Sequence, residues 1–562
     1  MRPCLAALSL AYVTVGSSTL AGPAEDVCPL YEEVSNTQHL RRLSLDLRLR
    51  VPDYEEYEAL GEGAVSDAVV DAYLESDEFL EMVRRFHTDL LWSNVSNVSL
   101  SSIEARLVAR GTERIFDFAG AVRRQTYRGI GSPPCADYPQ VDYCTAADMQ
   151  AGLYGCDGVG MPRKQDVAGF DVPVEGWVLV EPYWDPPSCT QNVECASRQC
   201  SAGSCAPAKV CAFAAQENEY WSAPPEPPSQ QTSCNFIGSP TRQGCGCGPN
   251  LRFCWEQSVE VEIRAALSEQ VDRLVEDVTV GDLPYSALLT SRRAHYNGPL
   301  FHFKKYLAQM TSLNQTFNFQ FEGDAPVPEE VSYADKSWVA VERAGVHAGV
   351  LTLPAFTLRF QTNRGRANRF RNAFMGQYFE PPAASVAGCD AESNDVMKRC
   401  YCQHCHQVLE PMAAYFGQIA EAGSALISDR TVFPKEMPAC AGGSQNILCR
   451  RFYVSTAGEE NLGRLLPLQY AGDDSEAHRQ IEPNFDAGPA ALAEQAIADG
   501  TFARTIVQHL WRYFMRREMD LSLGVEDESA LLDELAAELA SQDDFVAIVR
   551  RIVSLEHYRR MR

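Results

Sequence analysis

The segment Cys402-Gln403-His404-Cys405-His406 is a Cys-x-x-Cys-His sequence. Two thiols spaced by two residues lie on one turn of the chain, so each can add to one vinyl group of a haem. The histidine that follows is then carried to one face of the porphyrin, where it can serve as the fifth ligand of the iron. The motif therefore predicts one covalently attached haem c, held by Cys402, Cys405 and His406.

Three other interpretations of the motif are open from the sequence. With 20 Cys and 10 His in 562 residues, random placement would give roughly 0.01 such pentapeptides, so chance is a poor explanation. Cys402 and Cys405 could instead form disulfides, with each other or with Cys400 and Cys389, as in other exported cysteine-rich chains. A zinc site that includes Cys400 lacks a second Cys/His pair at zinc-ribbon spacing. A thioredoxin-like pair lacks the surrounding βαβ pattern.

The overall charge limits the partners. The chain has 49 basic and 75 acidic residues, a net charge of −26. Such a balance argues against nucleic acid and against anionic membrane surfaces as partners. We therefore expect no nucleic acid, and a redox partner protein with a basic docking surface. The length of 562 residues and the hydrophobic share of 45% predict two or more domains with sizeable cores.

The first 21 residues read as a secretory signal peptide. Arg2 supplies the positive end, Leu5 to Val15 form a short apolar core, and Thr19-Leu20-Ala21 resembles a small-residue cleavage site. No later stretch offers about 18 uninterrupted apolar residues, so no transmembrane segment is expected. Periplasmic or extracellular localisation agrees with the cysteine content and with a haem c.

Hydrophobic periodicity predicts a mainly α, multi-module helical protein with a small c-type haem region and a cysteine-rich, partly β, disulfide-stapled insertion. Helical spacing recurs at both ends and in the middle, and proline, glycine and cysteine interrupt it in between. The predicted modules are 22–131 (N-terminal, helical), 132–256 (cysteine-rich insertion with short strands), 257–384 (helical, with an arginine-rich stretch), 385–475 (haem c region) and 476–562 (C-terminal, helical).

Within the insertion, the segments from Gly176 to Trp184 and from Ala208 to Phe213 read as strands. The insertion has no long apolar run and cannot bury much surface, so we expect disulfides to order it. It is either a crosslinked surface module or a segment that recognises a partner or a carbohydrate.

Five arginines crowd the end of the 257–384 module, which is unusual in so acidic a protein. Two interpretations are open: the arginines pair with acidic neighbours on a helix, or some of them meet haem propionates or an anionic partner. The arginines are Arg359, Arg364, Arg366, Arg369 and Arg371.

Met437 is the predicted sixth ligand of the iron. It is 31 positions after His406 and lies in Phe433-Pro434-Lys435-Glu436-Met437-Pro438, where two prolines stiffen a loop that can return over the far face of the porphyrin. A thioether ligand favours ferrous iron and raises the potential. The alternative is that Met437 fills a gap beside Cys440. His478 is the next candidate ligand.

Several segments, in this order along the chain, resemble the modules of the planctomycete-type cytochrome c family, large exported proteins with a Cys-x-x-Cys-His motif. The segments are Arg41 to Leu47 followed by Pro52, Leu74 to Phe79, Pro284-Tyr285 through Tyr296 to Leu300, Arg343 to Thr352 with Arg364, Cys402 to His406 with Leu409-Glu410-Pro411, Gly488-Pro489, Gly500, Phe502-Ala503, and Leu531-Leu532 to Ser554 with Tyr558. Two parts depart from the common pattern: the cysteine-rich region from Ser132 to Trp255, and the sequence after Pro411, which keeps Gly417 but little else. The resemblance implies an exported haem c protein and supplies no substrate.

The sequence favours electron transfer, or a redox accessory role, over a catalyst with its own substrate. A haem c with two protein ligands changes oxidation state with little rearrangement. The alternatives are a haem-dependent oxidoreductase or peroxidase with an open sixth position, and a disulfide-rich extracellular binding protein without haem. No residues with the spacing of a hydrolytic triad or a phosphate-binding loop stand out, so no catalytic residue is assigned.

Overall fold

The computed structural model describes the helical parts of the chain and short pieces of the cysteine-rich segment. The described residues are 32–96, 100, 107–109, 116–118, 163–165, 171–173, 177–185, 208–211, 249–307 (without 253 and 255), 331–380, 388–522 (without 422, 425, 428, 429, 432, 443–446, 457, 458, 460, 473 and 474) and 528–561. The predicted signal peptide, 1–21, lies outside them.

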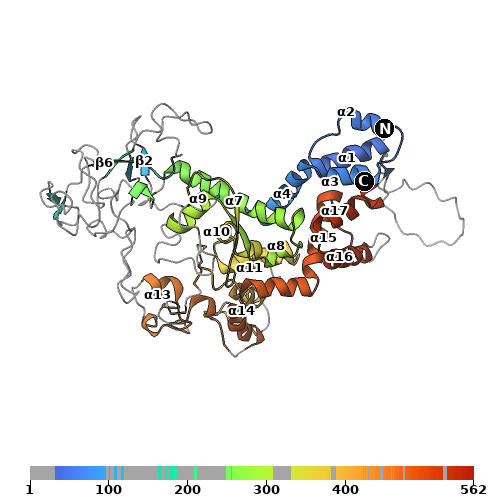
Figure 1. Ribbon diagram of the computed structural model, residues 1–562. Helices are drawn as coiled ribbons and strands as arrows, with labels where there is room; N and C mark the ends of the chain where they lie inside the picture. Colours follow the sequence, from blue (N-terminus) through green and yellow to red (C-terminus); the bar gives the residue numbers. More distant parts are fainter. Residues whose placement is uncertain are drawn as a thin grey trace, which may run out of the picture.

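Within these residues the protein is mainly helical, as predicted (Figure 1). The N-terminal helices are α1 (Asn36–Arg48), α2 (Tyr54–Leu60), α3 (Asp67–Leu74) and α4 (Asp77–Leu91). The central helices are α7 (Gln257–Thr279), α8 (Ala287–Thr290), α9 (Gly298–His302), α10 (Pro354–Arg359) and α11 (Asn363–Phe374). They are followed by α12 (Gln403–Ala414), α13 (Ile447–Phe452), α14 (Glu476–Ala498), α15 (Thr501–Met515), α16 (Ser529–Gln542) and α17 (Phe545–Val553).

The strands are short and form antiparallel pairs. The pairs are β1 (Glu32–Glu33) with β10 (Arg560–Met561), β2 (Leu107–Ala109) with β3 (Phe116–Phe118), β4 (Arg163–Gln165) with β5 (Asp171–Pro173), β6 (Trp177–Val180) with β7 (Ala208–Cys211), and β8 (Arg293–Tyr296) with β9 (Val339–Glu342). The pair β6 and β7 confirms the two strands predicted in the insertion.

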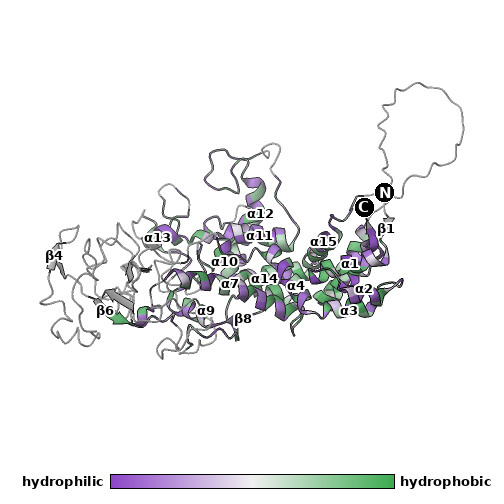
Figure 2. Ribbon diagram, turned by 90° about the horizontal axis from the view of Figure 1, so that it is seen from above, coloured by the Kyte–Doolittle hydropathy of each residue, from purple (hydrophilic) through white to green (hydrophobic). Residues whose placement is uncertain are grey.

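The helices begin and bury their side chains as their sequences predict. At α1 the Ser35 hydroxyl accepts a hydrogen bond from the Gln38 N–H, and the Gln38 side chain returns one to the Ser35 N–H, a reciprocal capping box. The predicted stripe of Leu40, Leu43 and Leu47 is buried. Hydrophilic and hydrophobic residues alternate along helices such as α1 and α15 (Figure 2), as expected where one face packs on a core.

The helices from three predicted modules share one hydrophobic core, which we call the helical core. It joins buried residues of α1, α3 and α4, of α7 to α11, and of α14 to α17, together with Ala413 of α12. In Figure 1, α7 (green) runs through the middle of the molecule towards α4 (blue). Its stripe of Ile263, Leu267, Val271 and Leu274 is buried at 1% exposure or less. The helical modules, although distant in sequence, are therefore packed as one body.

The two ends of the described chain are tied together beside α15 and α17 (Figure 1). The Arg42 guanidinium donates to the Tyr558 carbonyl and to the Phe514 carbonyl, each at 2.7 Å. The Tyr558 hydroxyl donates to the buried Asp46 carboxylate at 2.8 Å, and the Arg516 guanidinium donates to the same group at 2.7 Å. These bonds satisfy polar groups that the packing of α1 on the C-terminal helices buries.

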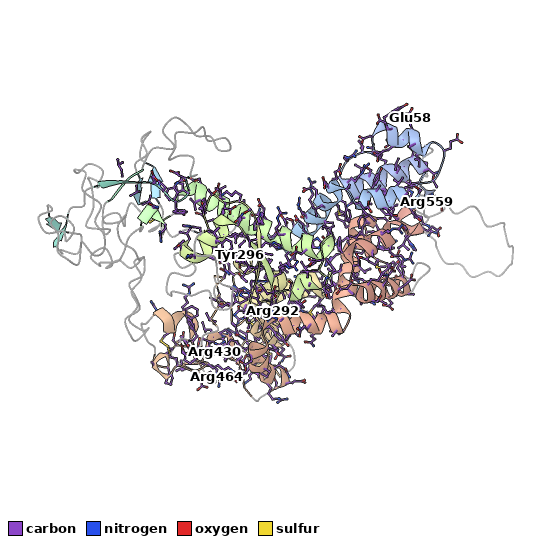
Figure 3. The ribbon with its side chains drawn as sticks, viewed as in Figure 1. Glu58, Arg292, Tyr296, Arg430, Arg464 and Arg559 are labelled. Atoms are coloured by element: carbon purple, nitrogen blue, oxygen red, sulfur yellow. A yellow bond between two sulfur atoms is a disulfide. The ribbon has the colours of Figure 1, made fainter. Side chains whose placement is uncertain are left out.

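A second, smaller cluster lies at α13 and the first part of α14. It contains Phe433, Phe452, Leu465, Ile481 and Phe485, together with both cysteines of a disulfide between Cys440 and Cys449. Two arginines that contact residues of this cluster, Arg430 and Arg464, are labelled in Figure 3. Arg430 lies over the Phe485 ring at 4.7 Å, and Arg464 donates to the Ala471 carbonyl at 2.7 Å. We call this the second cluster.

The predicted disulfides of the insertion fall outside the described side chains, except that Cys254 is disulfide-bonded. Among the described residues, no helix is both long enough and apolar enough to cross a membrane.

Candidate functional site

The Cys-x-x-Cys-His motif begins α12, which lies beside α11 (Figure 2). Cys402 is the residue before the helix, and Cys405 and His406 lie in its first turn. The N–H groups of Cys405 and His406 both donate to the Cys402 carbonyl, at 3.2 and 3.0 Å. Both thiols are free and partly exposed. The motif therefore has the one-turn geometry that its spacing predicts.

The chain just before the motif is fixed by a disulfide between Cys389 and Cys400, whose Cα atoms are 4.9 Å apart. Tyr401, with φ of 64°, turns the backbone between Cys400 and Cys402. The alternative in which Cys402 or Cys405 forms a disulfide is therefore wrong for this structure. Cys400 cannot serve as a zinc ligand either, because its sulfur is bonded to Cys389. In the described part of the chain no group of three or more His, Cys, Asp and Glu residues is arranged to hold a metal ion.

His406 is oriented by a carboxylate one turn further along α12. Its Nδ1 forms a hydrogen bond with Oε1 of Glu410. Because an ionised carboxylate only accepts, Nδ1 carries a hydrogen, and in a neutral imidazole the lone pair is then on Nε2. Arg364, on the first turn of α11, donates to both oxygens of Glu410, at 2.6 and 3.1 Å. This is how proteins orient a histidine that ligates a metal through its other nitrogen.

Glu410 is ionised although its side chain is only 8% exposed. Burial on its own raises the pKa of the Glu410 carboxyl, but the hydrogen bonds from His406 and Arg364 and the charge of Arg364 outweigh burial and hold that pKa below its ordinary value. Tyr470 lies close to the same group. Burial raises the pKa of the Tyr470 hydroxyl, and the nearby Arg364 lowers it while Glu410 and Asp395 raise it.

The arginines of the arginine-rich stretch have different kinds of partner. Arg364 pairs with an acidic neighbour, Glu410, as one interpretation predicted. Arg366 is fully buried and binds carbonyls instead. Arg369 lies over the Trp92 ring at 4.3 Å and donates to the Leu90 carbonyl. The carbonyls that Arg366 binds belong to Thr357, Phe360, Ile419, Ala420 and Gly423.

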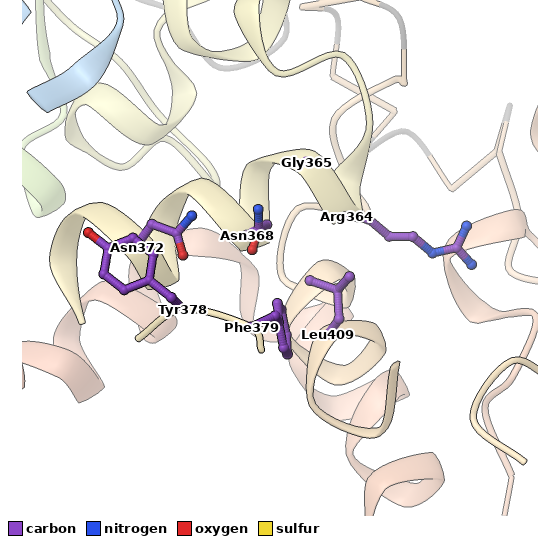
Figure 4. Close-up of a pocket in the computed structure, with 7 residues that line it drawn as sticks. All are labelled: Arg364, Gly365, Asn368, Asn372, Tyr378, Phe379 and Leu409. Atoms are coloured by element: carbon purple, nitrogen blue, oxygen red, sulfur yellow. The ribbon is translucent and has the colours of Figure 1, made fainter. Parts of the chain in front are cut away.

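A pocket of about 420 Å³ lies between α11 and α12 (Figure 4). This volume falls in the range of about 300–1,000 Å³ that small-molecule sites occupy. Phe379 and Leu409 lie side by side at its wall, and the Arg364 guanidinium points away from it (Figure 4). The lining residues are Arg364, Gly365, Asn368, Asn372, Tyr378, Phe379 and Leu409.

The chain fits a covalent haem at this place. Leu409, four residues after Cys405, brings the pocket next to the motif. In the part of the chain that the structure describes, three buried polar atoms of α11 near the pocket have no hydrogen-bond partner: Asn372 Oδ1 and the Nε and Nη1 atoms of Arg371. Burial lowers the pKa of the Arg371 guanidinium, and Cys405 is near enough to counter that effect. The two free thiols and the imidazole of His406 are the groups that a covalent haem c would use, and the apolar wall of the pocket could cover part of its ring.

Met437 lies in the second cluster. It is partly buried there, in the cluster that contains Cys440. Its N–H donates to the Gly463 carbonyl at 2.7 Å, so its backbone pairs with a neighbouring segment. A Cβ added to Gly463 would lie 2.8 Å from the Met437 carbonyl oxygen, so the two segments meet closely. The contact with the cluster agrees with the gap-filling interpretation, and the role of Met437 as an iron ligand stays a prediction.

His478, the other candidate ligand, has both ring nitrogens in use. Nδ1 lies 2.7 Å from the Ser475 hydroxyl, and Nε2 lies 2.6 Å from the Asp395 carboxylate. Iron coordination would have to break one of these buried hydrogen bonds. Instead, His478 ties the start of α14 to Asp395, which lies in the loop closed by the Cys389–Cys400 disulfide. His478 therefore helps to hold the segment that precedes the motif.

The chain matches no protein-family model, no curated protein and no solved structure. The resemblance to the planctomycete-type cytochrome c family therefore depends on the quoted segments alone.

Sequence reasoning missed Glu410 as a functional residue, although one signal was present. A carboxylate four residues after a histidine lies above it on the same face of a helix. Phe379 and Tyr470 gave no such signal, because their places beside the motif depend on the path of the chain after α11 and before α14.

Proposed function

We propose that this chain is an exported c-type haem protein that acts in electron transfer or as a redox accessory protein. One haem is held through Cys402, Cys405 and His406. The observation that carries the proposal is the contrast among the cysteines whose side chains the structure describes. Cys402 and Cys405 are free thiols on one helical turn, and the others, Cys254, Cys389, Cys400, Cys440 and Cys449, are disulfide-bonded.

Each of these residues would have a separate role in holding the haem. Cys402 and Cys405 anchor the ring, and His406 offers Nε2 while Glu410 holds its Nδ1–H. Phe379 and Leu409 keep water from one edge. A haem held in this way supplies a one-electron couple. One electron would enter from a reduced partner protein and leave to an oxidised one.

The proposed setting is the periplasm or the outside of the cell. The signal-like segment 1–21 and the disulfides Cys389–Cys400 and Cys440–Cys449 support it, since such bonds persist in oxidising compartments. The charge of −26 supports a partner whose docking surface is basic.

Covalent haem staining after denaturing electrophoresis tests the proposal. Thioether bonds survive denaturation, so the exported protein should carry stain equivalent to one haem per chain. Cys405→Ser should lose most of that stain. As a matched control, a Cys440→Ser and Cys449→Ser double variant should keep it. Haem that acid acetone extracts, or haem content unchanged in Cys405→Ser, would overturn the proposal.

A haem-dependent oxidoreductase or peroxidase is the second candidate, and Glu410 is the observation that favours it. A carboxylate on the ligand histidine makes the imidazole a stronger donor, which stabilises oxidised iron. The resting spectrum separates the two candidates. A low-spin ferric spectrum indicates two axial ligands and electron transfer, and a high-spin spectrum indicates an open sixth position.

A further inference from the structure

We propose that Glu410, fixed by Arg364, is a positioning residue that lowers the reduction potential of the iron bound to His406, so that the centre acts as a low-potential electron donor. The inference rests on the proposed function, because it concerns a haem at this site. It goes further by assigning a role to two residues outside the Cys-x-x-Cys-His motif and by giving the direction of electron flow.

The geometry is that of a three-membered chain of hydrogen bonds. Glu410 Oε1 accepts from His406 Nδ1 and from Arg364 Nε, and Oε2 accepts from the second guanidinium nitrogen of Arg364. The Glu410 side chain is 8% exposed and that of His406 is 24% exposed. Both oxygens of the Glu410 carboxylate therefore accept hydrogen bonds from groups of the protein.

Arg364 approaches Glu410 from a capped helix start, with its side chain 40% exposed. It lies in the first turn of α11, where the Thr362 hydroxyl accepts from the Gly365 N–H at 3.0 Å. The N–H of Asn363 donates to the Glu421 carboxylate at 2.9 Å. These bonds cap α11 and set the direction from which Arg364 approaches α12.

The carboxylate and the guanidinium act on the iron in opposite directions. A carboxylate that accepts the N–H of a ligand histidine raises the basicity of the imidazole, and the extra donation favours ferric over ferrous iron. The negative charge adds to the same effect in a partly buried site. The positive charge of Arg364 offsets part of it. Glu410 is closer to His406, so the net effect is a lower potential.

This direction opposes that of the predicted ligand Met437, because a thioether favours ferrous iron. The two influences reach the iron through different residues and can be measured separately. With Glu410 on one side, the centre gives up its electron more readily than a haem whose histidine bonds a neutral carbonyl. It would therefore pass electrons to an acceptor protein of higher potential.

Redox titration of the purified full-length haem protein at pH 8 tests the inference. Glu410→Gln removes the charge and keeps the shape. The neutral amide leaves the imidazole of His406 less basic and so favours ferrous iron, and the ferrous share should rise about tenfold at a fixed potential. For a one-electron couple that shift is about 59 mV to more positive values. Arg364→Gln should shift the potential the other way.

Glu534→Gln is the matched control. Glu534 is a glutamate in α16 with a 58% exposed side chain that pairs with Arg551, away from the motif and from Met437, so its loss should leave the potential unchanged. A rise in Glu410→Gln with a fall in Arg364→Gln supports the inference, because mere loosening of the site would move both variants in one direction. An unchanged or lower potential in Glu410→Gln overturns it. If Glu410→Gln does not mature, the direction in Arg364→Gln decides.

Failure of this inference is distinguishable from failure of the proposed function. Covalent haem stain in the wild-type protein and in both variants, with unmoved potentials, would remove Glu410 from its role and leave the haem protein intact. Absence of stain in the wild type would remove the proposed function itself.

Discussion

In the helical core, long helices bury leucine, valine and phenylalanine side chains against one another, whereas the second cluster is assembled from short irregular segments. A helix satisfies its own backbone, so its packing needs no covalent help. The second cluster instead pairs backbone groups across segments, as between Met437 and Gly463, and contains the Cys440–Cys449 disulfide. The Cys440–Cys449 disulfide therefore crosslinks a region where regular structure is scarce, although the helical core also includes the disulfide-bonded Cys254.

The candidate site lies where these two regions meet. In α12, Ala413 belongs to the helical core and its neighbour Ala414 to the second cluster. Arg366 of α11 donates to carbonyls on both sides of this boundary, that of Ile419 in the helical core and that of Ala420 in the second cluster. The motif is therefore held from both sides.

Loss of Arg366 should have the largest effect, because it would separate the two regions. Burial lowers the pKa of the Arg366 guanidinium to about 10, and its hydrogen bonds to carbonyls satisfy the charge. Arg366→Met leaves those carbonyls unpaired and should destabilise the protein by about 3–5 kcal/mol. Thermal unfolding followed by circular dichroism measures this.

Arg551→Met is the control for that substitution. Arg551 is 37% exposed and pairs with Glu534, so its loss should cost at most about 1 kcal/mol. Equal effects of the two substitutions would show that Arg366 does not join the regions.

Removal of the Cys440–Cys449 disulfide should affect the second cluster alone. The bond closes a loop with a sequence separation of 9, so its loss should cost about 2–3 kcal/mol. A double serine variant should be cut by protease within 388–485 while the helical core resists. Cutting that increases equally in both regions would contradict the comparison.

The protein should become less stable to unfolding at acidic pH, because the helical core buries the neutral imidazole of His87. Burial lowers the pKa of His87 from 6.5 to about 4, while a hydrogen bond to the Val83 carbonyl partly opposes this. Between pH 6.5 and pH 4 the His87 imidazole is therefore protonated in the unfolded chain and neutral in the folded chain. The free energy of unfolding falls as the pH drops through this range. Between pH 7 and pH 5 the loss should be about 2 kcal/mol for this group.

The measurement is the unfolding midpoint in denaturant at the two pH values. His87→Gln removes the titrating group and should shrink the difference between them. His557, only part of whose ring is buried, provides a matched control as His557→Gln, which should change the difference less. A pH dependence that His87→Gln leaves intact would contradict the assignment.

The sequence predicted the helical core well and the site in part. Leucine and valine at helical spacing lie on one face of a helix, so that face is the one that packs on the core, as with Leu40, Leu43 and Leu47. Cys402, Cys405 and His406 were visible because their spacing is local. Arg366 was not assigned its partners, because backbone carbonyls leave no pattern in a sequence.

Contacts between distant segments account for the rest. The sequence offered Cys389 and Cys400 only as partners of Cys402 or Cys405, whereas they pair with each other, and the link between His478 and Asp395 spans 83 positions. Such contacts are set by the path of irregular chain, which neither periodicity nor turn residues determine.

The smallest expected change in stability has the sharpest bearing on the site. Met437→Leu keeps the volume of a side chain that packs on the second cluster, so it should cost less than about 1.5 kcal/mol. The same substitution removes the only sulfur of that side chain. If Met437 ligates the iron, the ferric protein loses its weak long-wavelength sulfur-to-iron band and its potential falls, although the fold is intact. Met412→Leu, in α12 and packed on the helical core, is the control and should leave the band in place. A band and a potential that Met437→Leu leaves unchanged would make Met437 a packing residue of the second cluster, in keeping with its contacts there.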